Sequence, residues 1–344
     1  MNQNTVWALL RDLEKKKGIS EVIINSDTHV YIERAGDLIR LNVQLNKNDI
    51  IYFCDDVAKL NQVHYDINNP IIDGNLPDGS RINIISSEYT RSLPAITIRK
   101  YSADFTRLNE LEGKFGLTDK WVSFFQAIVK ARLNIVVSGG TGVGKTTFLN
   151  LLLQEIGVKE RVITIEDTKE LSFDHPNSVS LIAALNRSSV QNPLKTKDLI
   201  KNALRMYPTR IIVGEVRGAE AFDLLQAMNT GHDGSMTTVH ANNPVEALSR
   251  LESLFTYAGY DVPLRAIRKQ LSVAVDFIVQ LGKSRSGDRI IKEIYEVTGM
   301  EGDVIVTQKI GDIGDNGPVF TGLVPKNIPK LVEYGLDNNF FINI

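Results

Sequence analysis

The stretch of sequence that decides the fold reads Gly139-Gly140-Thr141-Gly142-Val143-Gly144-Lys145-Thr146-Thr147. It fits the pattern G-x-x-x-x-G-K-[ST] in full, between an apolar run at residues 133–137 and a helix-forming run at residues 148–156. A strand, a glycine-rich loop and a helix in this order are typical of a phosphate-binding loop. The pattern therefore predicts an α/β nucleotide-binding domain rather than a glycine-rich turn that merely joins a strand to a helix.

The residue types in this loop suit a nucleoside triphosphate. Glycines let backbone N–H groups approach phosphate oxygens without an intervening Cβ, and the N-terminus of the following helix adds partial positive charge. We expect Lys145 to reach the β- and γ-phosphates and the Thr146 hydroxyl to bind Mg²⁺. The residues predicted to bind the nucleotide are Gly139, Gly140, Thr141, Gly142, Val143, Gly144, Lys145, Thr146 and Thr147.

Composition narrows the class of protein. The chain has 344 residues, enough for two domains, and its net charge of -2 does not indicate a protein whose main task is binding nucleic acid. The single cysteine, Cys54, excludes an intrachain disulfide and is expected to be a small buried residue. No apolar run reaches the roughly 18 residues that span a bilayer, and no signal peptide is evident. We therefore predict a cytoplasmic protein whose membrane contact is indirect.

Hydrophobic periodicity divides the chain into two predicted domains. Residues 1–102 are expected to form a small α+β domain, residues 103–116 a polar linker, and residues 117–344 a domain with a mainly parallel sheet. The sequence from about residue 300 onward is interpreted as a peripheral strand and a helix cap. The predicted elements of the first domain are helices at residues 6–17 and 47–62, strands at 21–25, 30–34, 38–41 and 95–99, and a hairpin at 71–85.

Three further apolar strands of the second domain end on polar side chains. Residues 161–165 lead to Glu166 and Asp167, residues 210–213 lead to Glu215, and residues 235–239 lead to His240. In an open parallel sheet, ligands bind outside the carboxyl ends of the strands. The pattern therefore predicts a site that hydrolyses a nucleoside triphosphate.

The roles of these side chains follow from phosphoryl-transfer chemistry, which needs positioned charge and a positioned water. Glu215, on a strand expected beside the phosphate loop, is the first candidate to hold the hydration shell of Mg²⁺ or to polarise the attacking water. Glu166 is the competing candidate for the general base and also for a metal contact. Asp167 is expected to assist the metal or to accept backbone hydrogen bonds. His240 is interpreted as a sensor of the phosphate.

Arginines complete the predicted catalytic set. Arg217 follows Glu215 by two residues, and Arg81, Arg91 and Arg99 lie in the first domain. A guanidinium neutralises the charge that develops in phosphoryl transfer, although each of these arginines has the alternative of being an ordinary exposed side chain. The linker is a candidate hinge that closes the two domains over the nucleotide.

The order of the motifs resembles a known family. Residues 139–146, 164–167, 210–218 and 231–241 are similar to the Walker A, Asp box, Walker B and His box of type II/IV secretion ATPases. Further segments, at residues 18–22, 77–81, 204–208 and 291–303, extend the resemblance over nearly the whole chain. Together they look most like the CpaF/TadA branch, which drives Flp/Tad pili. The sequence begins almost at the predicted first domain, without the long N-terminal extension often seen in that branch.

The resemblance implies a homohexamer with ATP and Mg²⁺ bound between an N-terminal domain and a RecA-like P-loop domain. Glu166 and Glu215 match the acidic residues of the family and His240 its His-box histidine, while Arg81, Arg91 and Arg99 fall in the region that supplies phosphate-contacting arginines. Such a ring acts on an inner-membrane platform protein to assemble or retract a pilus. It places this protein in the cytoplasm, peripheral to the inner membrane through partners.

Four alternatives remain open from the sequence. A type IV secretion ATPase that moves protein or DNA would share the same site. A nucleic-acid translocase would need a basic stripe, and no such stripe stands out. A small-molecule P-loop kinase would need an acceptor pocket and a lid. A nucleotide-gated scaffold without turnover conflicts with the intact set of Lys145, Thr146, Glu166 and Glu215.

Overall fold

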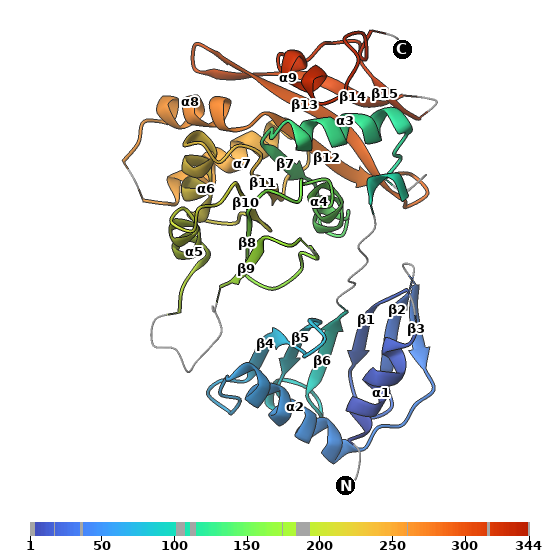
Figure 1. Ribbon diagram of the computed structural model, residues 1–344. Helices are drawn as coiled ribbons and strands as arrows, with labels where there is room; N and C mark the ends of the chain where they lie inside the picture. The colour runs from blue at the N-terminus through green and yellow to red at the C-terminus, as the bar shows by residue number, and fades with distance from the viewer. Residues whose placement is uncertain are drawn as a thin grey trace. The chain divides into compact units, whose positions relative to one another are not determined.

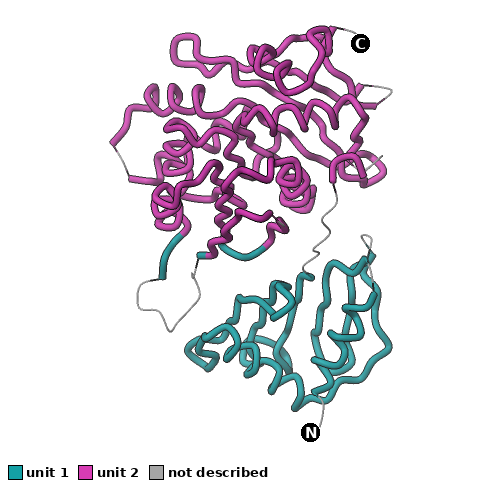
Figure 2. Tube along the Cα trace, in the orientation of Figure 1, with its two compact units in different colours: residues 1–103, 167–169, 183–195 teal, residues 104–166, 170–182, 196–344 magenta. Residues whose placement is uncertain are grey.

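The computed structural model describes residues 4–16, 18–34, 37–100, 107–110, 115–173, 175–183, 193–259, 261–314 and 317–342. Figure 2 shows two compact units, one of residues 1–103, 167–169 and 183–195, the other of residues 104–166, 170–182 and 196–344. The main division falls close to the predicted end of the first domain, but two short later segments group with the first unit. Most of the predicted linker lies outside the described residues, so the limits of the linker stay a prediction.

The first unit is built on a six-stranded antiparallel sheet with strand order β3-β2-β1-β6-β5-β4 (Figure 1). The strands predicted at its N-terminal end and the predicted hairpin are confirmed. Its elements are α1 (Thr5–Glu14), β1 (Ile19–Ile24), β2 (Val30–Arg34), β3 (Asp37–Leu41), α2 (Lys47–Asn61), β4 (Ile71–Asn75), β5 (Arg81–Ile85), the 3₁₀ turn η1 (Ser87–Tyr89) and β6 (Ala95–Arg99).

Alternation along the strands explains why one face of this sheet is covered. Val22, Ile82 and Ile98 are cross-strand neighbours, and all three are buried in one core with apolar residues of α1 and α2. Cys54 of α2 is fully buried in that core, as predicted, and burial raises the pKa of its thiol to about 12. Asn4 caps α1 by accepting a hydrogen bond from the N–H of Val6 at 2.9 Å.

The second unit holds a nine-stranded sheet with strand order β15-β14-β13-β12-β7-β11-β10-β8-β9. Six consecutive strands of this order, β12-β7-β11-β10-β8-β9, pair in parallel with one another, so the predicted mainly parallel sheet is confirmed. The nine strands of the sheet are β7 (Ile135–Ser138), β8 (Val162–Glu166), β9 (Ser178–Ile182), β10 (Arg210–Val213), β11 (Met236–Val239), β12 (Phe277–Lys283), β13 (Arg289–Glu301), β14 (Val304–Gly314) and β15 (Gly317–Phe320).

Helices cover this sheet as in an open α/β fold. α3 and α4 share one hydrophobic core with Ile135 and Val137 of β7 and with Phe277 of β12, and aromatic rings such as Phe124 fill it edge to face. Within the described residues, no helix has both the length and the apolarity to cross a bilayer. The helices are η2 (Leu108–Glu110, a 3₁₀ turn), α3 (Asp119–Lys130), α4 (Lys145–Leu153), α5 (Thr196–Ala203), α6 (Glu220–Asn229), α7 (Pro244–Thr256), α8 (Leu264–Ala274) and α9 (Ile328–Glu333).

The C-terminal part differs from its prediction as a peripheral strand and helix cap. β13, β14 and β15 are antiparallel and extend the sheet, and α9 follows them. Ile294, Ile310 and Phe320 of these strands are buried against Trp121 and its neighbours in α3. The apolar residues here are scattered among Gly, Asp and Asn, so the sequence lacks the continuous apolar run by which the parallel strands were recognised.

A buried arginine fastens the other end of the parallel strands. Arg210, at the start of β10, is fully buried and donates two hydrogen bonds to the Glu160 carboxylate, at 2.7 and 2.9 Å. It also donates to the backbone oxygens of Val129, at 2.8 Å, and Gly234, at 3.4 Å. One guanidinium thus joins the end of α3 and the segments that precede β8 and β11, which sets the relative position of the strands that carry the site.

Gly234→Ala is predicted to destabilise the protein more than Gly231→Ala. Both glycines have positive φ, +80° and +93°, so each substitution costs about 1–2 kcal/mol of backbone strain. A Cβ at Gly234 would lie 2.5 Å from Nη1 of Arg210, whereas a Cβ at Gly231 would meet no atom within 4 Å. Overpacking should therefore add roughly 1–3 kcal/mol at position 234. Urea unfolding of both variants measures the difference, and equal midpoints would contradict this packing.

Candidate active site

The predicted site residues meet at the C-terminal edge of the parallel strands. β7, β11, β10 and β8 are consecutive parallel neighbours, so their carboxyl ends share one edge of the sheet. The register places Val239 beside Ser138. Gly139 and His240, which follow these two residues, therefore begin at the same level, and Glu215 follows β10 at the same edge.

One expectation about the strand order is wrong. The strand that leads to Glu215 does not lie beside the loop strand, because β11 lies between β10 and β7. β11 follows β10 in the chain but lies between β7 and β10 in the sheet, and the motif order along the sequence does not determine this crossover. His240, at the end of β11, consequently lies between the phosphate loop and Glu215.

The loop itself has the geometry of a phosphate cradle. Gly139, Gly142 and Gly144 have φ values of +159°, +72° and +90°, a range that favours glycine. A Cβ at Gly139 would lie 2.6 Å from a methyl carbon of Val143, whereas Cβ positions at Gly140 and Gly142 would have no atom within 4 Å. The loop is therefore packed against its neighbours at Gly139. At Gly140 and Gly142 its backbone has space for a ligand.

Lys145 begins α4 and turns back into the loop. Its Nζ donates hydrogen bonds to the backbone oxygens of Gly139 at 3.0 Å and Gly140 at 2.9 Å, and the residue is only 8% exposed. Burial lowers the pKa of Lys145, although the carboxylate of Glu215 opposes the shift. The remaining predicted loop residues Thr141 and Thr147 are exposed.

A chain of polar contacts joins four of the predicted catalytic residues. The Lys145 Nζ lies 3.4 Å from Nδ1 and 3.3 Å from Nε2 of His240, and that Nε2 lies 2.9 Å from Oε1 of Glu215. Arg217 donates from Nη2 to the other oxygen of Glu215 at 2.5 Å. The structure therefore brings Lys145, His240, Glu215 and Arg217 together, while their catalytic roles stay a prediction.

A neutral His240 can accept a hydrogen bond from the Lys145 ammonium. Both ring nitrogens lie within 3.4 Å of Nζ, and whichever nitrogen carries no hydrogen can be the acceptor. Burial lowers the pKa of His240, Glu215 raises it, and the charges of Lys145 and Arg217 lower it, which leaves a pKa below 6.5. The imidazole is therefore neutral at neutral pH and separates a cation from an anion.

The pKa of His240 in the folded protein is predicted to be below 6.5, and to fall further in Glu215→Gln. Because the folded state disfavours the imidazolium, the contribution of His240 to stability is complete above pH 6.5 and is lost as the pH falls through 6.5 toward the folded pKa. NMR titration of the ring protons measures both values, with His29, which has an exposed side chain, as the internal reference. A His240 pKa above 6.5, or one that rises in Glu215→Gln, would contradict the assigned environment.

Glu166 is a buried carboxylate that binds backbone N–H groups of the segment that follows it. It is 4% exposed, and its Oε1 accepts hydrogen bonds from the N–H groups of Glu170 at 2.9 Å and Leu171 at 2.8 Å. A Cβ at Gly214 would lie 3.0 Å from its Cγ, so Gly214 provides the space for this side chain. Glu166 thus fixes the segment that follows β8, and its role as base or metal contact stays a prediction.

Glu170 is a candidate site residue that the sequence reasoning missed. Its Oε2 accepts a hydrogen bond from the Thr146 hydroxyl at 3.2 Å. The residue lies in a loop, four positions after Glu166, and it does not directly follow a strand, the feature that marks the other predicted side chains. The spacing Glu-Asp-x-x-Glu was the available signal, since Glu166 itself holds the backbone of this loop.

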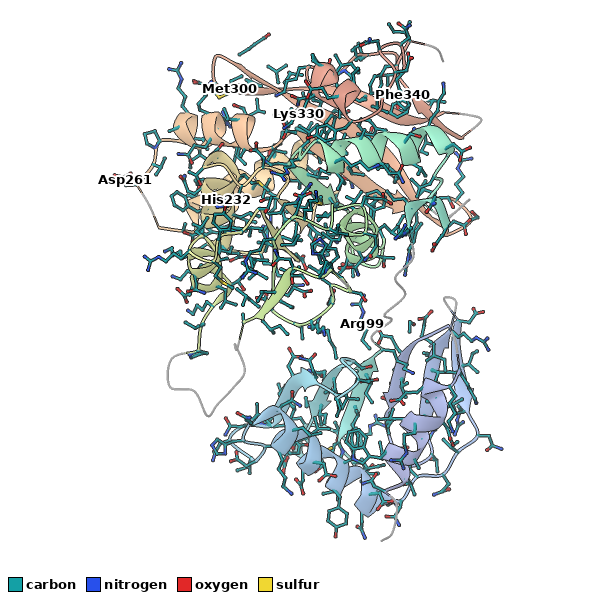
Figure 3. The ribbon with its side chains drawn as sticks, in the orientation of Figure 1. Arg99, His232, Asp261, Met300, Lys330 and Phe340 are labelled. Atoms are coloured by element: carbon teal, nitrogen blue, oxygen red, sulfur yellow. The ribbon has the colours of Figure 1, made fainter. Side chains whose placement is uncertain are left out.

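The other three predicted arginines, Arg81, Arg91 and Arg99, belong to the first unit, whereas the phosphate loop belongs to the second. Arg81 and Arg99 are direct cross-strand neighbours on β5 and β6, and Arg91 is an exposed residue between η1 and β6. Figure 3 labels Arg99, at the end of β6, where its side chain is exposed. The expected contact of these arginines with a nucleotide stays a prediction.

The fold and site define a P-loop protein with an acidic and imidazole cluster at the loop. Comparison with known proteins agrees: the family described as type II/IV secretion system protein matches residues 5–293. The conjugal transfer protein TrbB of Rhizobium radiobacter is 32% identical over 305 residues, covering 88% of this chain and 90% of TrbB. The type IV secretion system protein VirB11 of Bartonella quintana is 31% identical over 345 aligned positions, covering 86% and 96%.

A solved structure shows the same fold. The ATPase DotB of Legionella pneumophila is similar with a TM-score of 0.62 at 19% identity, covering 88% of this chain and 82% of DotB. The chain belongs to the type II/IV secretion system protein family and is one of its ATPases. The resemblance inferred from the motif order is thus confirmed at the level of the family.

Proposed function

We propose that this chain hydrolyses ATP with Mg²⁺ and serves as the motor of a type IV secretion machine. The observation that supports the proposal most directly is the contact chain from Lys145 through His240 to Glu215, beside a loop open to a triphosphate. It places a phosphate-binding cation and a carboxylate on either side of one imidazole. Phosphoryl transfer to water needs such positioned charges more than covalent chemistry.

The donor set near the loop suits Mg²⁺. Thr146 supplies a hydroxyl, and Glu170, whose carboxylate contacts it, and Glu215 supply oxygens, the ligands that this ion prefers. When bound, Mg²⁺ would neutralise charge that develops on the phosphate oxygens. Glu166 would act indirectly on the Mg²⁺ site, because the hydrogen bonds that it accepts from the backbone position the segment that carries Glu170.

Each residue has a distinct task in this proposal. Lys145 leaves the carbonyl oxygens of the loop and binds the terminal phosphates. Glu215 accepts a proton from, or orients, the attacking water, and Arg217 holds its other oxygen. When Lys145 binds the phosphates, it no longer contacts His240. His240 then changes its contact with Glu215, and this change signals that the site is occupied.

The assembled form that we propose is a cytoplasmic homohexamer on an inner-membrane platform protein. Arg81, Arg91 and Arg99 would complete each nucleotide site by neutralising phosphate charge. The similarity to proteins named for conjugal transfer and type IV secretion supports a secretion machine as the assembly that this ATPase would drive. With a net charge of -2, stable binding of nucleic acid is not expected.

The second candidate is the assembly or retraction of an Flp/Tad-like pilus, which the motif order favours. The two candidates share the hydrolytic site and differ in the partner that the ring drives. Deletion of the gene separates them: loss of surface pili supports the pilus motor, and loss of protein or DNA transfer with pili unaffected supports the secretion motor.

The test of the hydrolytic function is release of inorganic phosphate from ATP by the purified chain. We expect turnover that requires Mg²⁺ and that Lys145→Ala abolishes without a change in fold. Phosphate release must occur without an added acceptor molecule. Turnover that depends on a small-molecule acceptor would instead identify a kinase, and turnover that persists in Lys145→Ala would exclude this site.

A further inference from the structure

The hairpin of β12 and β13 presents two cations beside the phosphate loop. On the face that packs on the core, Leu281 and Ile291 are opposite one another and buried. The next pair on the same face is Lys283 and Arg289, and both are exposed. The side of the hairpin that is apolar over the core therefore becomes cationic where the core ends.

The loop is the neighbour of this cationic end (Figure 1). A Cβ at Gly144 would lie 3.0 Å from Cδ of Arg289, and a Cβ at Gly139 would lie 3.4 Å from Cβ of Leu281. Gly144 immediately precedes Lys145 and α4, so the guanidinium extends from a point beside the backbone that would bind phosphate. The positive φ and the close arginine stem together require glycine at this position.

Two like charges directly opposite in an antiparallel pair are unfavourable without a counter-ion. Within the described part of the chain, the structure shows no ion pair or hydrogen bond for the side chain of Lys283 or Arg289. The nearby Asp288 is engaged in the turn, where its carboxylate accepts a hydrogen bond from Ser286 and its N–H donates to Ser284 at 3.1 Å. The hydrogen bonds of Asp288 are thus made within the turn that joins the two strands of the cation pair.

We propose that Lys283 and Arg289 form a subsite for the α-phosphate of the nucleotide. This inference rests on the proposed nucleotide-binding function of the loop. Lys145 reaches the β- and γ-phosphates, so the α-phosphate is the one to which the loop offers no side-chain cation. Arg289 supplies such a cation beside Gly144, where the loop joins α4. A guanidinium suits it because its parallel N–H groups bind two phosphate oxygens at once.

The test compares ADP with pyrophosphate, a ligand that occupies the loop and has no α-phosphate. Calorimetric titration of Arg289→Met is expected to show ADP binding weakened about tenfold or more, the usual effect of losing a charged hydrogen bond. Binding of pyrophosphate should be unchanged. Lys283→Met should act in the same direction, and Arg289→Lys should recover part of the loss.

Arg285→Met is the matched control, since Arg285 is an exposed arginine of the same hairpin turn. It should bind both ligands as the wild type does. Unchanged ADP binding in Arg289→Met, or an equal loss for ADP and pyrophosphate, would overturn the α-phosphate subsite. Failure of the wild type to bind either ligand would instead overturn the nucleotide site itself, so the two failures are distinguishable.

Discussion

Glu215→Gln is expected to reduce ATP turnover about 10²–10⁴-fold, the range found when a general base is removed from a positioned water. The amide keeps the shape of the side chain and an oxygen for Arg217, but it cannot accept the proton of the attacking water. It also removes the anion that His240 contacts at 2.9 Å. Because the loop and Lys145 are untouched, ATP should still bind, and the loss should appear in kcat rather than in KM.

Glu333→Gln is the control for this loss, since Glu333 is an exposed carboxylate at the end of α9, outside the site. Its turnover should match that of the wild type. Steady-state phosphate release together with binding of a fluorescent ATP analogue separates chemistry from affinity. A Glu215→Gln protein with more than one tenth of wild-type turnover would exclude Glu215 as the base and favour Glu170 or Glu166.

Arg210→Met is expected to lower the free energy of unfolding by about 3–5 kcal/mol, the usual cost of removing one partner from a buried ion pair. Methionine fills much of the space but leaves the Glu160 carboxylate without its two hydrogen bonds, and it leaves the oxygen of Val129 without the donor at 2.8 Å. Arg132→Met removes the other arginine that pairs with Glu160. Its side chain is 46% exposed, so its loss should cost at most about 1 kcal/mol.

The pH dependence provides a second measurement on the same residues. Burial raises the pKa of Glu160, but hydrogen bonds and charge from Arg210, with the charge of Arg132, outweigh burial and leave the pKa below 4.5. The stability that Glu160 contributes is therefore present above pH 4.5 and is lost as the pH falls through its folded pKa. Urea unfolding across this range should show that acid-dependent part in the wild type and not in Arg210→Met. Equal stability of Arg210→Met and Arg132→Met would contradict the inferred role of the buried Arg210–Glu160 ion pair.

Local patterns were enough to predict the elements that carry the site. The glycine pattern of residues 139–147 fixes a strand, a loop and a helix, because each glycine with positive φ is a local requirement. Polar residues directly after buried strands, Glu215 and His240 among them, were placed at one edge because parallel strands share that edge. These predictions needed no knowledge of which strand lies beside which.

The parts that could not be predicted depend on contacts between distant residues. The insertion of β11 between β7 and β10 decides that His240, not Glu215, adjoins Lys145. Glu170 comes close to Thr146 because hydrogen bonds to Glu166 fold the loop that carries it. The cation pair of the β12–β13 hairpin could not be predicted as a phosphate subsite, because the loop beside it lies far away in the sequence.

The measurement that tests the central claim most directly is the ATPase rate per subunit as a function of protein concentration, with particle mass from light scattering in the same samples. Lys145→Ala is the control for contaminating activity. We expect the rate per subunit to rise as the protein assembles into a particle of hexamer size, because in the proposed ring Arg81, Arg91 and Arg99 would complete each site. Full activity in a stable monomer would contradict the proposed motor.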